Sequence, residues 1–427
     1  MGMFRFAAII LPIAFLIACG TSGTTLPIES GPTTPLHNAA ENNEAKVVAS
    51  LLDGGADIEA RNEIGATPLH VAVEYNKPEV VALLLDRGAN IEARTEDEAT
   101  PLHVAASNNG AEVVALLLDR GADIEARSVA GNTSLHYASG HNKPEVVALL
   151  LDGGADIEAR TENGKTPLHF ATEYNQLEVV VLLLDGGADV GARNERGVTP
   201  LHVAVAYNKP EVVALLLDRG ADIESLAEFG WTPLHVAARN GEPEVVALLL
   251  DRGADITTRD DVPSQVSWGN VFAKAALIMV RLSLEALSPN RDEEGYYDFR
   301  KRDRRKRLGE ILYSPVTFNP GGNMPLHFAA GFNKPDVVAL LLDEGADIKA
   351  RTDFGWTPLH YAAIFSATPE VITLLLDRGA DVHARDQDER TPLDYAEDNK
   401  HLKGSNVLER LKAAQEGVPI IFEPPAN

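Results

Sequence analysis

A period of 33 residues constrains this chain more than any other feature. The tetrapeptide Thr-Pro-Leu-His, or a variant with one residue changed, begins at Thr34 and returns every 33 residues as far as Thr232. It returns again at Met324, Thr357 and Thr391. A fixed period of this length is typical of a solenoid, in which each repeat contacts only its neighbours. The 427 residues therefore predict one elongated array rather than several globular domains.

The residue types within one period predict two short helices. In the second copy, Thr67 is a good N-cap residue, and Pro68 suits a first helical position because no N–H is needed there. Asn76 tolerates the left-handed conformation that ends a helix, and Pro78 opens a second, largely apolar helix. Gly88 follows that helix at the position where a positive φ is usual.

The signature and its period resemble the ankyrin repeat, in ten copies that share one register. The resemblance implies an all-α repeat solenoid: a stack of helix-turn-helix units with β-hairpin-like fingers. Seven copies are expected in residues 32–259 and three, ending in a C-terminal cap, in 319–416. Thr232 and Met324 stand 92 residues apart, so residues 260–318 form a 59-residue insertion. The proline-containing tail, 417–427, is expected to be unfolded.

The N-terminus indicates export. Arg5 precedes an apolar run, residues 6–17, which is too short to span a bilayer, and Leu16-Ile17-Ala18-Cys19 resembles the bacterial lipobox. We therefore expect residues 1–18 to be a lipoprotein signal peptide, with Cys19 as the lipidation site. Residues 19–31 are then a flexible tether. An ordinary secretory signal is the alternative. The expected location is the periplasmic face of the bacterial outer membrane, or the cell membrane.

Composition narrows the possible functions. Lys and Arg total 38 against 63 Asp and Glu, a net charge of −25, which disfavours nucleic acid and favours a partner with a basic surface. A single cysteine excludes a disulfide framework and any zinc site with two or more thiolates. No nucleophile–base, Walker A or metalloprotease motif is present. The chain is therefore predicted to be no enzyme and to need no cofactor.

The repeated histidines and carboxylates are expected to serve the scaffold. Nine of the 12 histidines belong to the signature, and the resemblance implies that each imidazole binds finger backbone and links adjacent copies. Neighbouring copies stand about 10 Å apart, too far for two such rings to share a metal ion. The recurrent Asp-Ile-Glu-Ala-Arg is likewise expected to order the finger base.

Partner binding is the predicted function, on the concave face that the resemblance implies. The aromatic slot, defined as the fifth residue after the signature histidine, repeatedly holds a large ring, and the fingers beside the insertion hold four more. Rigid rings give contact area at low entropic cost. The alternative is that the rings pack on adjacent helices. The predicted partner-binding residues are Tyr75, His141, Tyr174, Tyr207, Phe229, Trp231, Phe332, Phe354, Trp356 and Phe365.

The insertion has two parts of opposite character. Residues 270–288 predict an amphipathic helix with a narrow polar stripe, and residues 300–307 hold seven basic side chains and one acidic one. Lys274 and Arg281 interrupt the apolar part, so it is no membrane span. Residues 270–307 could contact a lipid surface, or lie solvated near the acidic scaffold. A cytosolic regulator whose basic insertion binds nucleic acid is the alternative function.

Overall fold

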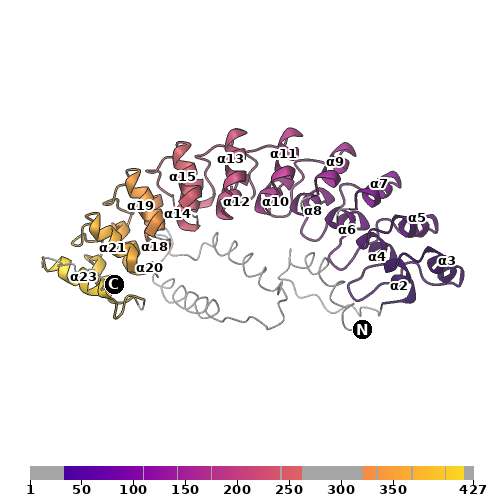
Figure 1. Cartoon of the computed structure of the whole chain (residues 1–427), viewed down its shortest axis with the longest axis horizontal. Helices are drawn as coiled ribbons and strands as arrows, with labels where there is room; N and C mark the ends of the chain where they lie inside the picture. Colours follow the sequence, from indigo (N-terminus) through magenta and orange to yellow (C-terminus); the bar gives the residue numbers. More distant parts are fainter. Residues whose placement is uncertain are drawn as a thin grey trace, which may run out of the picture. The chain divides into compact units, whose positions relative to one another are not determined.

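Paired helices make up the regular structure of the described residues. The structure is a computed structural model that describes residues 33–108, 110–141, 143–174, 176–240, 243–261, 321–332, 335–366, 369–399 and 401–417. Across these ranges, every regular element is a helix. The helices in these ranges form ten pairs, which confirms the all-α solenoid and the number of copies. Figure 1 shows the paired arrangement.

Each copy contributes a first and a second helix. The first helices carry the signature: α2 (Pro35–Glu41), α4 (Pro68–Glu74), α6 (Pro101–Asn108), α8 (Ser134–Gly140), α10 (Pro167–Glu173), α12 (Pro200–Ala206), α14 (Pro233–Asn240), α18 (Pro325–Phe332), α20 (Pro358–Phe365) and α22 (Pro392–Ala396). The second helices are α3 (Ala45–Asp53), α5 (Pro78–Asp86), α7 (Ala111–Asp119), α9 (Pro144–Asp152), α11 (Leu177–Asp185), α13 (Pro210–Asp218), α15 (Pro243–Asp251), α19 (Pro335–Asp343), α21 (Pro369–Asp377) and α23 (Asn406–Gln415). A 3-10 turn, η1 (Glu228–Gly230), lies in one finger.

The chain divides into two units. Unit 1 comprises Met1–Val203 with Asp218–Ala221, and unit 2 comprises Ala204–Leu217 with Asp222–Asn427. Within unit 1, the first helices α2, α4, α6, α8 and α10 pack one against the next, and so do the second helices α3 to α11. Within unit 2, the same two rows are α14, α18, α20, α22 and α15, α19, α21, α23.

Capping by the signature begins each first helix. Thr67 has extended backbone, φ −87° and ψ 167°, and its side chain and the His70 ring form a reciprocal capping box. The positive φ expected of the asparagine that follows is present at Asn43, Asn76 and Asn208. Its counterparts Asn109, Asn142, Asn175, Asn333 and Gly241 lie outside the described residues.

The second helices are buried along one face rather than around most of their circumference. In α5, Val80, Val81 and Leu84 are fully buried, whereas Leu83 and Leu85 are half-buried. The helix ends at Asp86, and Gly88 just beyond it has φ 89°, where an added Cβ would meet no atom within 4 Å. The glycine is therefore needed for its backbone conformation alone.

The two ends of the array differ. In the last copy Asp394 replaces the histidine and still accepts a hydrogen bond from the Thr391 N–H at 2.7 Å. Arg410 of α23 pairs with Asp377 at 2.7 Å, and Leu411 is buried. In the first copy Val47 is 43% exposed, although its counterpart Val80 is 0% exposed.

Several predicted segments lie outside the described residues: the signal peptide, Cys19 and the tether, residues 262–318 of the insertion with the adjoining residues 319–320, and residues 418–427. The chain is described up to Asp261 and again from Gly321. Within the described ranges, no helix combines the length and apolarity needed to cross a bilayer.

Candidate functional site

The signature histidines form a buried, neutral row that links the copies. The Thr100 N–H donates to His103 Nδ1 at 3.1 Å, so the proton of the neutral ring lies on Nε2. Nε2 then donates to the Asn132 carbonyl, 29 residues further on, at 3.0 Å. Burial lowers the pKa of His103 to about 4. The prediction that these rings bind finger backbone in the next copy is confirmed.

Metal binding by this row would require atoms that are already used. Both ring nitrogens of His103 have hydrogen-bond partners, and the ring is 0% exposed. Across the described ranges, no group of three or more His, Cys, Asp or Glu side chains could hold a metal ion.

The finger bases form a second row of links. In unit 1, Glu59 Oε1 accepts from the Asn90 N–H of the next copy at 2.7 Å. Arg61 Nη1 donates to the carbonyl of Gly65 at 3.1 Å and to that of Arg94 in the next finger at 2.5 Å. These carboxylates and guanidinium groups are therefore occupied by the scaffold, as the sequence predicted.

The aromatic slot lies at the C-terminal ends of the first helices. Tyr75, His141 and Tyr174 are the C-cap residues of α4, α8 and α10, and each is half-buried. The His141 ring contacts the Tyr137 carbonyl through Nδ1 at 2.7 Å. Tyr174 packs beside Gly140 of the preceding copy, where an added Cβ would come within 3.5 Å of its ring. Tyr207, in unit 2, is also half-buried.

In unit 2, four of the predicted residues, Trp231, Phe332, Trp356 and Phe365, gather with Phe328 and Tyr361 into one aromatic cluster. Trp231 meets Phe328 edge-on with centroids 5.0 Å apart. Phe332 stacks on Phe365 at 5.4 Å, with an angle of 24° between the ring planes. Trp356 lies between Tyr361 and Phe365, at 5.8 and 6.3 Å.

The exposed fraction of each aromatic side chain distinguishes the rings that pack inside the protein from those that remain partly exposed. Trp231 and Trp356 are only 6% and 3% exposed, which leaves little surface for a partner. Trp356 Nε1 also donates to Asp386 Oδ2 at 3.0 Å. Phe332 and Phe365 are half-buried, as are the finger residues Phe229 and Phe354. Partner contact by these four rings stays a prediction.

Sequence reasoning missed Arg239, which holds the cluster together from α14. Its guanidinium lies 5.3 Å from the Trp231 centroid and 5.2 Å from that of Phe332. It occupies the position that Glu74 occupies in α4. The signal available in the sequence was a basic residue at a repeat position where most other copies have an acidic or a small residue.

Aromatic residues directly after the signature histidine were also missed. Tyr137 packs edge-on against His103 of the preceding copy, with centroids 5.5 Å apart and planes at 90°. Phe328 and Tyr361 make the same contact with His235 and His327, at 5.9 and 5.4 Å. Their shared place after the histidine could have identified them.

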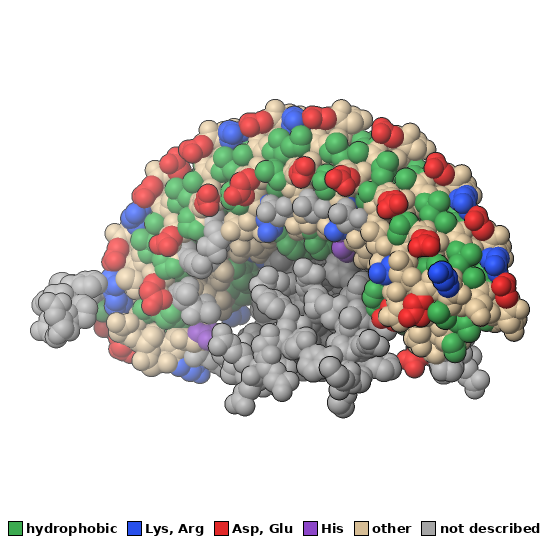
Figure 2. Space-filling view, turned by 45° about the vertical axis from the view of Figure 1, so that its right-hand side comes forward, with side chains coloured by type: hydrophobic (Ala, Val, Ile, Leu, Met, Phe, Trp, Pro, Cys, Tyr) green, Lys and Arg blue, Asp and Glu red, His purple; other side chains and the backbone are tan. Residues whose placement is uncertain are grey.

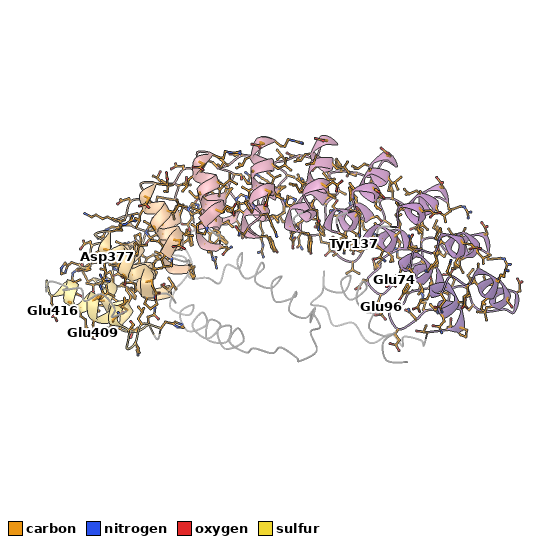
Figure 3. All side chains as sticks on the ribbon, viewed as in Figure 1. Glu74, Glu96, Tyr137, Asp377, Glu409 and Glu416 are labelled. Atoms are coloured by element: carbon orange, nitrogen blue, oxygen red, sulfur yellow. The ribbon has the colours of Figure 1, made fainter. Side chains whose placement is uncertain are left out.

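Two carboxyl groups on the first-helix side of unit 1 have raised pKa values. Burial, with the nearby charge of Glu41 as a smaller cause, raises the pKa of Glu74 to about 8. Burial and the Glu96 charge raise the pKa of Asp97 at a finger tip. Figure 3 shows Glu74 and Glu96 on the side formed by first helices and fingers. On the face in view in Figure 2, acidic side chains recur along the helices and cationic ones are fewer.

Known protein sequences and structures are similar to parts of this chain. A family model of three ankyrin repeats matches most of the chain, over residues 13–95, 36–128, 102–194, 145–227, 168–260 and 326–414. An ankyrin repeat protein of Rickettsia bellii (strain RML369-C) is 47% identical over 58 residues, which cover 14% of this chain. The match spans 23% of that relative's length.

Two solved structures are similar to part of the chain. The human ASB11 ankyrin repeat domain is 28% identical with a TM-score of 0.48, over 52% of this chain and 99% of that domain. The ankyrin repeat domain of Bcl-3, described as a unique member of the IkappaB protein family, is 35% identical with a TM-score of 0.45. It aligns over 52% of this chain and all of that domain, at 100% coverage.

Proposed function

Because the chain belongs to the ankyrin-repeat family, whose arrays are protein-interaction scaffolds, we propose that it is a non-catalytic scaffold for one protein partner. The proposed binding surface is, within each unit, the side formed by the first helices and the finger tips, called here the first-helix face.

The observation that carries the proposal is the stacked, half-buried pair Phe332 and Phe365. The first helices are otherwise largely buried along the residues that follow the signature, for example Ala329 and Ala330. Two rings held 5.4 Å apart, and braced by Arg239, form a contact surface that is already ordered before binding. Ordered aromatic surface is what interaction hot spots use.

A basic partner surface is proposed from charge. The chain carries a net charge of −25, and the first-helix side of unit 1 places Glu74 near Glu41. Burial holds the pKa of Glu74 near 8, so this carboxyl is mostly protonated at neutral pH. A cationic side chain from a partner would favour its charged form, since an opposite charge lowers a carboxyl pKa.

Export and anchoring form the next part of the proposal. Residues 1–18 would direct export, and acylation of Cys19 would fix the array to the periplasmic face of the outer membrane or to the cell membrane. The Leu-Ile-Ala-Cys pattern at the end of a short apolar run supports this. Radiolabelled palmitate should be incorporated into the full-length chain in its host and lost in Cys19→Ala. Equal labelling of both chains would contradict the lipoprotein proposal.

Residues 270–307 could add a contact with anionic lipid, because the segment combines apolar and basic residues. Sedimentation with anionic vesicles should then fall when this segment is removed from the Cys19→Ala chain. Nucleic acid is disfavoured as a partner by the overall negative charge.

The partner itself is to be identified by affinity capture from host envelope extract, with the purified array as bait. The captured protein is then compared for binding to the unaltered chain and to Phe332→Ala/Phe365→Ala. Binding that does not depend on either ring would contradict the proposed surface.

A further inference from the structure

Uninterrupted fingers in this array share a five-residue turn. The first residue donates its N–H to the carbonyl of the fifth, as from Ala227 to Trp231 at 2.8 Å and from Thr352 to Trp356 at 2.9 Å. The fourth residue has positive φ, for example 72° at Gly230. At Phe229 the third residue also has positive φ, 65°.

The finger between α15 and α18, called here the interrupted finger (residues 259–261 and 321–324), has the same turn. The Asp260 N–H donates to the Asn323 carbonyl at 2.9 Å, so these residues are the first and fifth positions. Gly321 and Gly322 have φ 76° and 69°, which match the third and fourth positions. Residues 262–320 are therefore inserted between the second and third positions of a turn that is otherwise complete.

Both sides of the interrupted finger keep the links that join neighbouring fingers. The Asp261 N–H donates to the Phe229 carbonyl of the preceding finger at 2.8 Å. The Asp353 N–H of the following finger donates to the Gly321 carbonyl at 3.0 Å. The signature histidine of α14, His235, reaches the Asn323 carbonyl at 3.1 Å.

Buried polar contacts hold the two sides together. Asp260 is 4% exposed and Asn323 is fully buried. The Asn323 N–H donates to Asp260 Oδ1 at 2.8 Å and its side-chain Nδ2 donates to Oδ2 at 3.1 Å. The Tyr361 hydroxyl donates to Asn323 Oδ1 from α20. Since a buried carboxylate is costly without partners, these contacts fix both sides in one geometry.

An ion pair closes the outside of the turn. Arg259 Nη2 lies 2.7 Å from Asp353 Oδ1 of the next finger. The pair passes directly over Gly322, where an added Cβ would collide with both side chains. Glycine therefore suits this position for two reasons: it adopts the positive φ, and it leaves room for the ion pair.

We propose that the turn of the interrupted finger is complete without residues 262–320, and that the repeats of unit 2 fold and stack without them. Removing them joins Asp261 to Gly321 and leaves the turn Asp260-Asp261-Gly321-Gly322-Asn323, which has the length of Ala227–Trp231. Whatever residues 262–320 bind is then separable from the folding of the array and from binding at the first-helix face.

The test compares two deletions of 59 residues in the full-length chain. One removes 262–320. The matched control removes 259–317 and so loses Arg259, Asp260 and Asp261, while it leaves a chain of equal length. Helical circular dichroism, thermal midpoint and amide exchange at Asn323 are measured for both and for the unaltered chain.

The proposal expects the 262–320 deletion to stay within about 2 °C of the unaltered midpoint, as a surface change would, and to keep Asn323 protected. The control should lose more than about 5 °C and the protection of Asn323. Aggregation or unfolding of the 262–320 deletion would overturn the proposal. Equal thermal midpoints and equal protection of Asn323 in the two deletions would also overturn it, because the contacts of Asp260 would then not stabilise the interrupted finger.

Discussion

His103 and Asn132, in adjacent copies, are joined by a hydrogen bond from the histidine Nε2 to the asparagine carbonyl at 3.0 Å. The histidine also caps its own helix, since Nδ1 accepts from the Thr100 N–H at 3.1 Å. One neutral ring therefore couples helix initiation to stacking. Protonation of the ring removes the capping function, because Nδ1 then has no lone pair to accept the Thr100 N–H, whereas Nε2 can still donate to the Asn132 carbonyl.

Stability should fall as the pH is lowered from about 6.5 towards 4. Burial lowers the pKa of His70, His103 and His235 to about 4, and that of His136 to about 3, against an ordinary value of 6.5. The unfolded chain then binds more protons than the folded one across this window, so unfolding is favoured as protons are added. Each histidine that titrates with global unfolding should cost about 2 kcal/mol at pH 5. Urea unfolding at pH 7, 6 and 5 measures this, and an unchanged free energy would contradict buried neutral rings.

Glu74 should act in the opposite direction. Burial raises its pKa to about 8 from 4.5, so the folded state binds the proton more tightly than the unfolded state. Its contribution to stability is present below pH 4.5 and is lost as the pH rises through 8. Glu74→Gln should therefore flatten the decline of the thermal midpoint between pH 6 and 9. An unchanged decline in that variant would show that other groups cause it.

Removing one linking histidine should destabilise the array strongly. His103→Ala leaves the Thr100 N–H and the Asn132 carbonyl buried without this partner, at about 1–3 kcal/mol each. His383 is exposed outside the signature, so His383→Ala is the matched control and should stay within about 0.5 kcal/mol. Chemical denaturation of both variants provides the comparison. Equal losses of unfolding free energy in the two variants would contradict a special role of the signature histidine.

Substitution by alanine should destabilise the protein to different extents at two glycines that both have positive φ. Gly345 has φ 93° and an added Cβ would meet nothing within 4 Å, so Gly345→Ala should cost about 1–2 kcal/mol of backbone strain. Gly322→Ala also displaces the exposed Arg259–Asp353 ion pair and should cost up to about 1 kcal/mol more, the contribution of a surface ion pair. Thermal unfolding of the two variants measures the difference. A smaller loss at Gly322 would mean that the ion pair moves aside freely.

Trp356 should behave as a core residue although the sequence suggested a contact role. It is 3% exposed and packs on Tyr361 and Tyr395 at 5.8 and 5.6 Å, so Trp356→Ala should cost about 3–5 kcal/mol. Half-buried Phe354, two residues earlier, is the control and should lose less. Similar midpoints for the two variants would contradict the packing role.

Repetition explains why the fold could be predicted from the sequence. Thr67, Asn76 and Gly88 each have a local conformational preference, and their recurrence at one period turns weak preferences into a strong pattern. The finger links were predictable for the same reason, because Glu59 and Arg61 recur with their partners in the next copy.

The candidate site was less predictable because it depends on side chains that do not repeat. The burial of Trp231 follows from Phe328 and Arg239, which lie in two different helices, and Arg239 is the one basic residue at its repeat position. The insertion boundary was placed after Arg259, whereas the finger continues through Asp261, since Asp260 pairs with a residue 63 positions later. Neither contact is a property of one repeat.

The most direct test of the scaffold proposal is the affinity of the captured partner for three chains. These are the unaltered chain, Phe332→Ala/Phe365→Ala on the first-helix face, and Asp336→Ala/Glu370→Ala at exposed positions of α19 and α21. The proposal predicts that the aromatic double variant binds at least about 30-fold more weakly, the loss of one hot spot of about 2 kcal/mol, while it keeps the helical circular dichroism of the unaltered chain at the temperature of the assay. The second-helix variant should bind as the unaltered chain does. Full affinity in the aromatic variant, or a loss confined to the second-helix variant, would contradict binding at the first-helix face.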